Sequence, residues 1–116
     1  MSPLGPEPAK LAPLPRDFLE GLVALLDATA PPLLDDAMTK ATPRDDGVEV
    51  VLAHTTTIAF SLWAQAAREV IVVGCSATET EHRSAGEALE VVGALLRGER
   101  EVRGYDGRVL RPSFLA

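Results

Sequence analysis

Hydrophobic residues recur along this chain with two different periods, which separate helical from extended segments. From Arg16 to Thr29 they return every three or four positions with charged residues between them, as on the buried face of a helix. Pro31-Pro32 follows, and because the second proline disfavours helical geometry at the first, this helix should end there. A short second helix over 33–38, with its apolar residues turned inward, would make the N-terminal element a helix pair.

The helical period returns between Ser84 and Arg97, where the local signals agree best. Ser84 precedes Glu87 by three residues, the spacing at which a hydroxyl and a carboxylate together cap the start of a helix. Gly98 follows the last apolar turn and supplies the left-handed residue that commonly ends a helix. We therefore expect a capped helix over 85–97.

The extended segments either alternate apolar and polar residues or contain short β-branched runs. Val48 to Leu52 alternates, and Glu69 to Gly74 contains consecutive valines and isoleucine, so both are predicted to be strands. Residues 57–67 are ambiguous, because a β-branched and aromatic first half precedes a helix-forming second half. We favour a strand there, which gives a three-stranded antiparallel meander.

Asp106-Gly107 is a strong turn signal between two stretches, 100–105 and 108–115, that can pair with each other. The sequence therefore predicts a C-terminal β-hairpin, whose strand from Arg108 to Leu115 would offer an edge for pairing with another chain. The residues from Thr42 to Gly47 are typical of a turn.

Together these elements predict an α+β fold with the helices on one face of the sheet. If residues 57–67 are helical instead, the order becomes β-α-β-α-β, an α/β fold with a partly parallel sheet. The chain of 116 residues is long enough for one domain, which we place at 16–116. Five prolines within residues 1–15 predict a disordered arm there.

The net charge limits the classes of partner that we expect, and the cysteine content indicates the cellular compartment. Seventeen acidic residues against eleven basic ones give a net charge of −6, whereas binding to nucleic acid or to an anionic membrane depends on clustered positive charge. We expect neither partner. A single cysteine and an N-terminus without the apolar run of a signal peptide predict a cytoplasmic protein. Abundant alanine, leucine and arginine with only two lysines suggest a bacterial source.

Residues able to do chemistry are few and match no recognised motif. Cys75 with His54 or His82 could form a thiolate–imidazolium pair, although a lone cysteine after a strand is commonly a small core residue. Ser76 follows Gly74 but lacks the second glycine of a nucleophile elbow.

Metal and cofactor sites are not expected either. Glu79, Glu81 and His82 match no zinc or calcium spacing and are interpreted as a solvated acidic loop, and no glycine loop could hold a phosphate. The alternative function, a small α/β enzyme or ligand-binding protein, would have its site near His54 and Cys75, at the carboxyl ends of two strands. A strand at 57–67 is expected to place those ends on opposite edges of a meander.

Trp63 and Tyr105 are the candidate interaction residues, because aromatic side chains with a polar group are favoured at interface centres. In the predicted strand Trp63 projects away from Leu62 and from the core.

The predicted order of elements resembles that of two families. Its α-β-β-β-α part resembles double-stranded RNA-binding domains, whose second helix opens with a lysine-rich motif. At the corresponding positions this chain has three acidic residues, Glu79, Glu81 and Glu87, and one basic residue, Arg83, so RNA binding is not expected. With the hairpin added, the order resembles small secretion-type chaperones that dimerise and wrap an extended client. We predict a non-enzymatic acidic protein–protein interaction domain, chaperone- or adaptor-like, which binds a protein partner or forms a homodimer.

Overall fold

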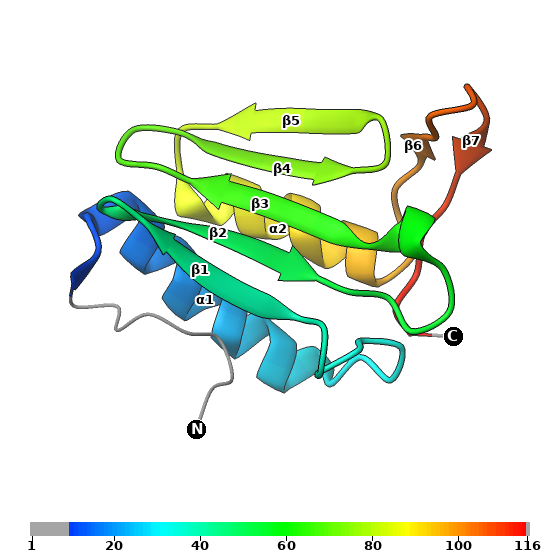
Figure 1. Ribbon diagram of the computed structural model, residues 1–116, viewed down its shortest axis with the longest axis horizontal. Helices are drawn as coiled ribbons and strands as arrows, with labels where there is room; N and C mark the ends of the chain where they lie inside the picture. Colours follow the sequence, from blue (N-terminus) through cyan, green and yellow to red (C-terminus); the bar gives the residue numbers. More distant parts are fainter. Residues whose placement is uncertain (1–9, 116) are drawn as a thin grey trace.

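The structure is a computed structural model that describes residues 10–115. Within these residues it contains two long helices, a five-stranded sheet and a small hairpin (Figure 1). The elements are α1 (Pro13–Thr29), β1 (Lys40–Arg44), β2 (Gly47–Leu52), the 3-10 turn η2 (Ile58–Phe60), β3 (Leu62–Ala66), β4 (Ile71–Cys75), β5 (Thr78–His82), α2 (Ala85–Leu96), β6 (Val102–Arg103) and β7 (Val109–Leu110). No helix in this part of the chain is long and apolar enough to cross a membrane.

The strands β1 to β5 form one meander in which each strand pairs with its sequence neighbours and every pair is antiparallel. Both helices lie on one side of this sheet, and no described helix or strand covers the other side (Figure 1). The predicted α+β class is therefore confirmed. The α/β alternative is wrong, because residues 57–67 contain the three-residue 3-10 turn η2 and strand β3 instead of an α-helix, and no strand pair described is parallel.

The core lies between the sheet and the two helices and is mainly aliphatic. Alternate residues of β2, β3 and β4 point into it, as the period of a strand requires: Val48, Val50, Leu52, Leu62, Ala64, Ala66, Ile71, Val73 and Cys75. The helices contribute Phe18, Leu19, Leu22, Ala88, Val92, Leu95 and Leu96. The other alternate residues of the strands face the uncovered side of the sheet.

Helix α1 begins three residues before its predicted start. Proline is tolerated in the first helical turn, where its missing N–H would have had no partner, so Pro13 and Pro15 belong to the helix. Leu11 and Ala12 before them are buried, and the Ala12 N–H donates to the Asp46 carbonyl at 3.0 Å. Of the predicted arm, residues 10–15 are thus packed against the domain, while residues 1–9 lie outside the described residues.

The predicted second helix over 33–38 is wrong. Asp35 forms a turn there, because its side-chain Oδ1 accepts hydrogen bonds from the N–H groups of Ala37 and Met38, at 3.0 and 3.2 Å. This local bonding competes with helical bonding. Met38, expected to point inward, is exposed, and Leu34 instead pairs with His54 as an isolated bridge.

Two strands were not predicted, so the meander has five strands instead of three. β1 occupies part of the segment interpreted as a turn; its Pro43 is compatible with a strand because β1 is at the edge of the sheet. β5 replaces the predicted acidic loop, and its alternation of threonine and glutamate has the period of a strand. With five strands between the helices, the order matches neither the RNA-binding nor the chaperone resemblance.

The capped helix is confirmed as α2. The Ser84 hydroxyl accepts a hydrogen bond from the Glu87 N–H at 3.2 Å, and Gly98 has a positive φ of 75° just past the helix end. The hairpin also exists, but β6 and β7 have two residues each and form a separate sheet. Phe114 is fully buried, and its N–H donates to the Leu96 carbonyl at 2.8 Å. The residues from 108 to 115 therefore do not supply the long edge strand that was expected.

Candidate functional site

The uncovered face of the sheet is centred on Trp63, which lies on the middle strand β3. Trp63 pairs with Val51 on one side and with Gly74 on the other, and it faces away from the core as predicted. A Cβ atom built on Gly74 would lie 2.1 Å from Cε2 of the Trp63 indole, so the ring rests directly on the Gly74 backbone. A glycine at this position is therefore required for the indole to lie down on the sheet.

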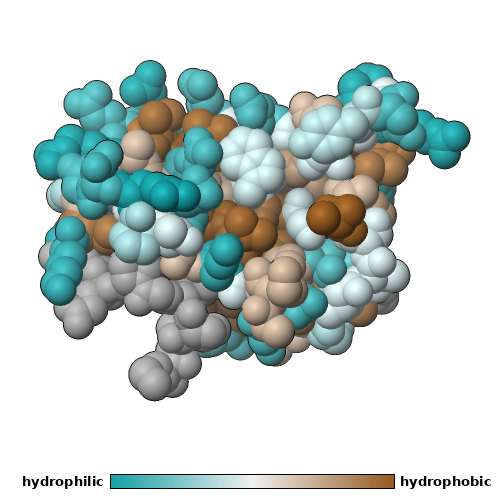
Figure 2. Space-filling view, viewed as in Figure 1, coloured by the Kyte–Doolittle hydropathy of each residue, from teal (hydrophilic) through white to brown (hydrophobic). Residues whose placement is uncertain are grey.

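Apolar and charged side chains are distributed unequally over this face. Val51, Trp63 and Val72 are half-buried near its middle. Figure 2 shows hydrophobic surface near the middle of this view and hydrophilic side chains along its upper and left margins. Lys40 on β1 and Glu79 on β5 are exposed at the two opposite edges. The face has the apolar centre and polar rim of a contact surface.

Tyr105, the second candidate aromatic residue, lies elsewhere. It is 84% exposed in the turn between β6 and β7, whereas Trp63 belongs to the central strand of the main sheet. The two candidates therefore lie in different sheets: Trp63 is in the five-stranded sheet and Tyr105 is in the β6–β7 hairpin.

His54 holds the C-terminal segment against the loop after β2. Its Nδ1 accepts hydrogen bonds from the N–H groups of Thr56 and Thr57, at 3.1 and 3.3 Å, so the ring proton is on Nε2, which donates to the Ser113 carbonyl at 2.8 Å. The ring also makes an edge contact with Phe114, with centroids 4.8 Å apart. Both nitrogens are thus occupied by the backbone, and neither is free to act as a base in this arrangement.

Cys75 is an inert core residue by its surroundings. It is 1% exposed, and its Sγ lies 3.7 Å from the Ala59 carbonyl oxygen and 3.8 Å from that of Phe60. Burial raises the pKa of the Cys75 thiol from 9.0 to about 11, which suppresses the reactive thiolate at neutral pH.

The expectation that a meander would place His54 and Cys75 on opposite edges is wrong. Alternate strands of a meander run in the same direction, so β2 and β4 end at the same end of the sheet, separated only by β3. Phe60 stands between the two residues: its ring contacts the His54 ring, with centroids 5.4 Å apart, and its carbonyl faces the thiol. The two residues share a neighbourhood, but no hydrogen bond joins them within residues 10–115.

Ser76 and the acidic residues do not complete a reactive group. The Ser76 hydroxyl donates to the Ala59 carbonyl at 2.7 Å and thereby fixes the η2 turn. Across the described part of the chain, no group of three histidine, cysteine or carboxylate side chains could hold a metal ion. Every buried side-chain nitrogen and oxygen there also has a hydrogen-bond partner.

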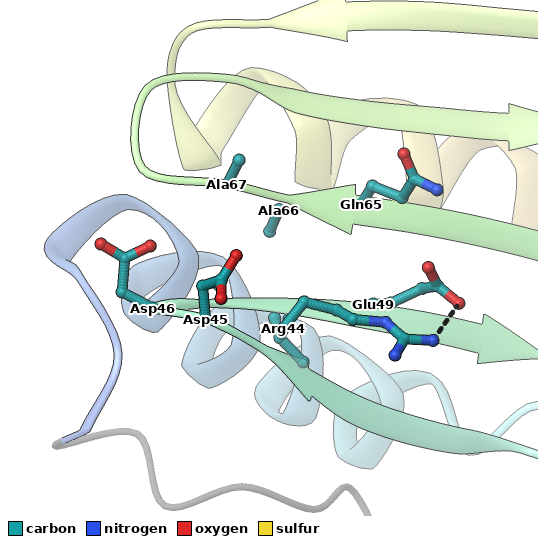
Figure 3. A pocket seen from close by; sticks show the side chains of 9 residues that line it. Arg44, Asp45, Asp46, Glu49, Gln65, Ala66 and Ala67 are labelled. Carbon is teal, nitrogen blue, oxygen red and sulfur yellow. Dashed lines mark ion pairs between the residues drawn. The ribbon is translucent and has the colours of Figure 1, made fainter.

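A shallow hollow of about 280 Å³ lies where the β1–β2 turn meets the end of β3. Figure 3 shows its polar lining: Asp45 and Asp46 at the turn, and Glu49 with Arg44 beside it, 3.8 Å apart as an ion pair. Gln65 and the backbone of neighbouring residues complete the wall. The lining contains no histidine, cysteine or serine, so it lacks a thiol or serine hydroxyl nucleophile and an imidazole base.

Comparison with protein-family models, curated proteins and solved structures finds no match for this chain.

Proposed function

We propose that this chain is a non-enzymatic protein-interaction domain that binds proteins through its β-sheet. The observation that carries the proposal is the uncovered face, where Trp63 lies over Gly74 at the centre of the sheet. A half-buried tryptophan flanked by valines supplies contact area to a partner and no reactive group. The engagement of His54 by backbone groups and the burial of Cys75 support a non-enzymatic role.

A second copy of the chain is the first partner to test, because Trp63 belongs to the central strand. A twofold axis parallel to the sheet and passing above Trp63 would place all five strands of one copy over those of the other. Each indole would then contact the valines of the other copy. From the usual strand spacing and rise, the face measures roughly 24 by 17 Å, about 400 Å² in plan. Since stable complexes bury about 800 Å² per partner, we expect a weak homodimer with a dissociation constant between about 10 µM and about 1 mM.

Sedimentation velocity over about two decades of concentration around 100 µM would test this self-association. Gln65→Lys adds a charge to the same face while leaving the indole in place, and Gln65 is exposed, so the fold should tolerate it. Tyr105→Ala is the matched control, because it removes the other exposed aromatic residue. We expect the average mass of the wild type to rise with concentration, the Gln65→Lys variant to stay monomeric and Tyr105→Ala to behave as wild type.

Two outcomes would count against this interface. A Gln65→Lys variant that associates as the wild type does would show that the face is not the contact surface. A wild type that stays monomeric throughout would rule out the homodimer.

A further inference from the structure

The two edges of the sheet differ in the backbone groups that they leave free. In an antiparallel sheet alternate residues of an edge strand bond inward, and the others direct their N–H and C=O groups outward. Because Arg44 and Gly47 flank the two-residue β1–β2 turn as a pair, the outward residues of β1 are Ala41 and Pro43. Proline has no N–H to donate. The next outward N–H, on Thr39, already donates to the Asp35 carbonyl at 2.9 Å, so β1 can offer one donor at most.

The other edge, along β5, is open. Cys75 and Thr78 flank the two-residue turn before β5 as a pair, so the outward residues of β5 are Glu79 and Glu81. No hydrogen bond occupies the N–H group of either residue within the described chain. Figure 1 shows no helix or strand running along the outer side of β5. The edge can therefore present two complete backbone donor–acceptor pairs.

The C-terminal hairpin sets the end of this open edge. The Ala77 N–H donates to the Arg103 carbonyl at 2.9 Å, and the Arg103 N–H donates to the Thr78 hydroxyl at 2.7 Å. A hollow of about 320 Å³ lies between Thr78 and the hairpin residues Val102 and Val109. An added strand would thus stop against the hairpin, with space at its end for a side chain.

The side chains of this edge are acidic and unpaired. Glu79 and Glu81 are exposed on the same face of the sheet, and neither forms an ion pair with a described residue. An arginine lies beyond each end of the segment that carries Glu79 and Glu81. Arg83 donates to the Glu69 carbonyl at 3.5 Å, and Arg103 donates to the Gly107 carbonyl at 3.0 Å. Glu101, which lines the hollow beyond Thr78, is paired with Arg111 at 3.7 Å, so the unpaired negative charge of this edge lies on Glu79 and Glu81.

We propose that the β5 edge binds an extended segment of another protein, which adds to the sheet as a sixth strand and carries lysine or arginine at two alternate positions. In antiparallel addition these two residues lie directly opposite Glu79 and Glu81, with Cα atoms about 5.5 Å apart. A longer basic run would meet Arg83 or Arg103, so two basic residues fit better than a polybasic tract. This inference rests on the proposed interaction function but uses a different surface from the Trp63 face.

A second copy of the chain does not suit this edge. Antiparallel pairing of two β5 strands about Thr80 would set Glu79 of each copy opposite Glu81 of the other. Four carboxylates would then stand in one row, and like charges directly opposite one another destabilise a strand pair.

Fluorescence anisotropy with a labelled synthetic peptide, acetyl-Gly-Thr-Lys-Thr-Lys-Thr-Gly-amide, tests the proposal directly. We expect saturable binding, and binding at least about tenfold weaker when both lysines are replaced by glutamate. N-methylation of the two lysines should abolish binding, because their N–H groups face β5. N-methylation of the threonine between them is the matched control and should leave binding intact, because that N–H points outward.

Protein variants distinguish the contribution of backbone hydrogen bonds to peptide binding from that of side-chain charge. Glu81→Pro removes an outward N–H without touching the bonds to β4, and it should weaken binding about tenfold or more. Glu79→Gln with Glu81→Gln keeps the edge and should weaken binding by about fivefold. If Glu81→Pro does not fold, the reversal of both residues to lysine replaces it: this variant should lose the lysine peptide and bind the glutamate peptide. Gln65→Lys, which tests the Trp63 face, should leave peptide binding unchanged, so the two proposals can fail separately.

Three results would overturn the proposal. One is the absence of saturable binding up to about 1 mM peptide. Another is binding that survives lysine N-methylation or Glu81→Pro, which would indicate general electrostatic attraction. The third is protection of the Glu79 and Glu81 amides from exchange in the free protein, if this protection increases with protein concentration. A second copy would then occupy the edge. We expect these two amides to become protected only when the peptide is added.

Discussion

The contact between Trp63 and Gly74 gives the sharpest test of this structure. Gly74→Ala adds one methyl group where Cε2 and Cζ2 of the indole both lie 2.1 Å from the new Cβ. The substitution must lift the ring off the sheet or move the β3 and β4 backbones apart. Overpacking of this kind costs about 1–3 kcal/mol. Glycine is otherwise poorer than alanine inside a strand by roughly 0.5–1 kcal/mol, so without the indole the same substitution should stabilise the protein.

The sign of the effect therefore depends on Trp63. In the wild-type background we expect Gly74→Ala to lower the free energy of unfolding, and in a Trp63→Ala background we expect it to raise it slightly. Urea unfolding followed by circular dichroism measures all four proteins of this double-mutant cycle. The control is Gly86→Ala in helix α2, where a Cβ would meet nothing within 4 Å. It should stabilise both backgrounds equally, by up to about 1 kcal/mol.

Fluorescence provides an independent reading, because the chain has one tryptophan. Gly74→Ala should shift the emission of Trp63 to longer wavelength as the ring becomes more exposed to water, whereas Gly86→Ala should not. An unchanged emission spectrum, or a Gly74→Ala cost that is the same with and without the indole, would refute the placement of Trp63 over Gly74.

Two further predictions concern the end of the sheet where β2 and β4 finish. Because burial raises the pKa of the Cys75 thiol from 9.0 to about 11, the folded state favours the protonated thiol; this stability is fully present below pH 9.0 and is lost as the pH rises toward about 11. Urea titrations at these two pH values measure the effect: the free energy of unfolding should fall by about 2 kcal/mol more in the wild type than in Cys75→Ala. The same fall in both proteins would contradict the burial of the thiol. His54→Phe removes three hydrogen bonds to backbone groups and should cost about 1–3 kcal/mol. His82→Gln, which affects one bond to Thr80, should cost less than about 0.5 kcal/mol in the same assay, and equal costs would argue against the role of His54.

The candidate surface was predictable only in part. That Trp63 and its neighbour Leu62 face opposite sides of the sheet follows from the period of a strand, and the structure confirms it. Its partner Gly74 could not be inferred, because the two residues are eleven positions apart in sequence and meet only through the register of β3 with β4. The β5 edge was missed although Thr78 to Glu81 alternate with the period of a strand. The acidic residues there favoured a loop, since charged side chains are scarce in strands that are covered on both faces.

Elements whose signals are local could be predicted from the residue pattern alone. The hydroxyl of Ser84 caps α2 and the left-handed Gly98 follows its end, because both depend on bonds within one turn of chain. The class of fold was also predictable, since the helical and extended periods are separated along the chain.

The number of strands in the sheet and the surfaces that it leaves open depend on contacts between residues far apart in the sequence. β1 and β5 are poor strands by composition and exist because β2 and β4 offer them backbone partners. The helix-forming residues of β3 became extended for the same reason, since a central strand gains hydrogen bonds on both sides and buries Leu62 and Ala64 beneath two helices. Long-range pairing therefore overrode local preference, and it also determined that one face and the β5 edge of the sheet remain uncovered.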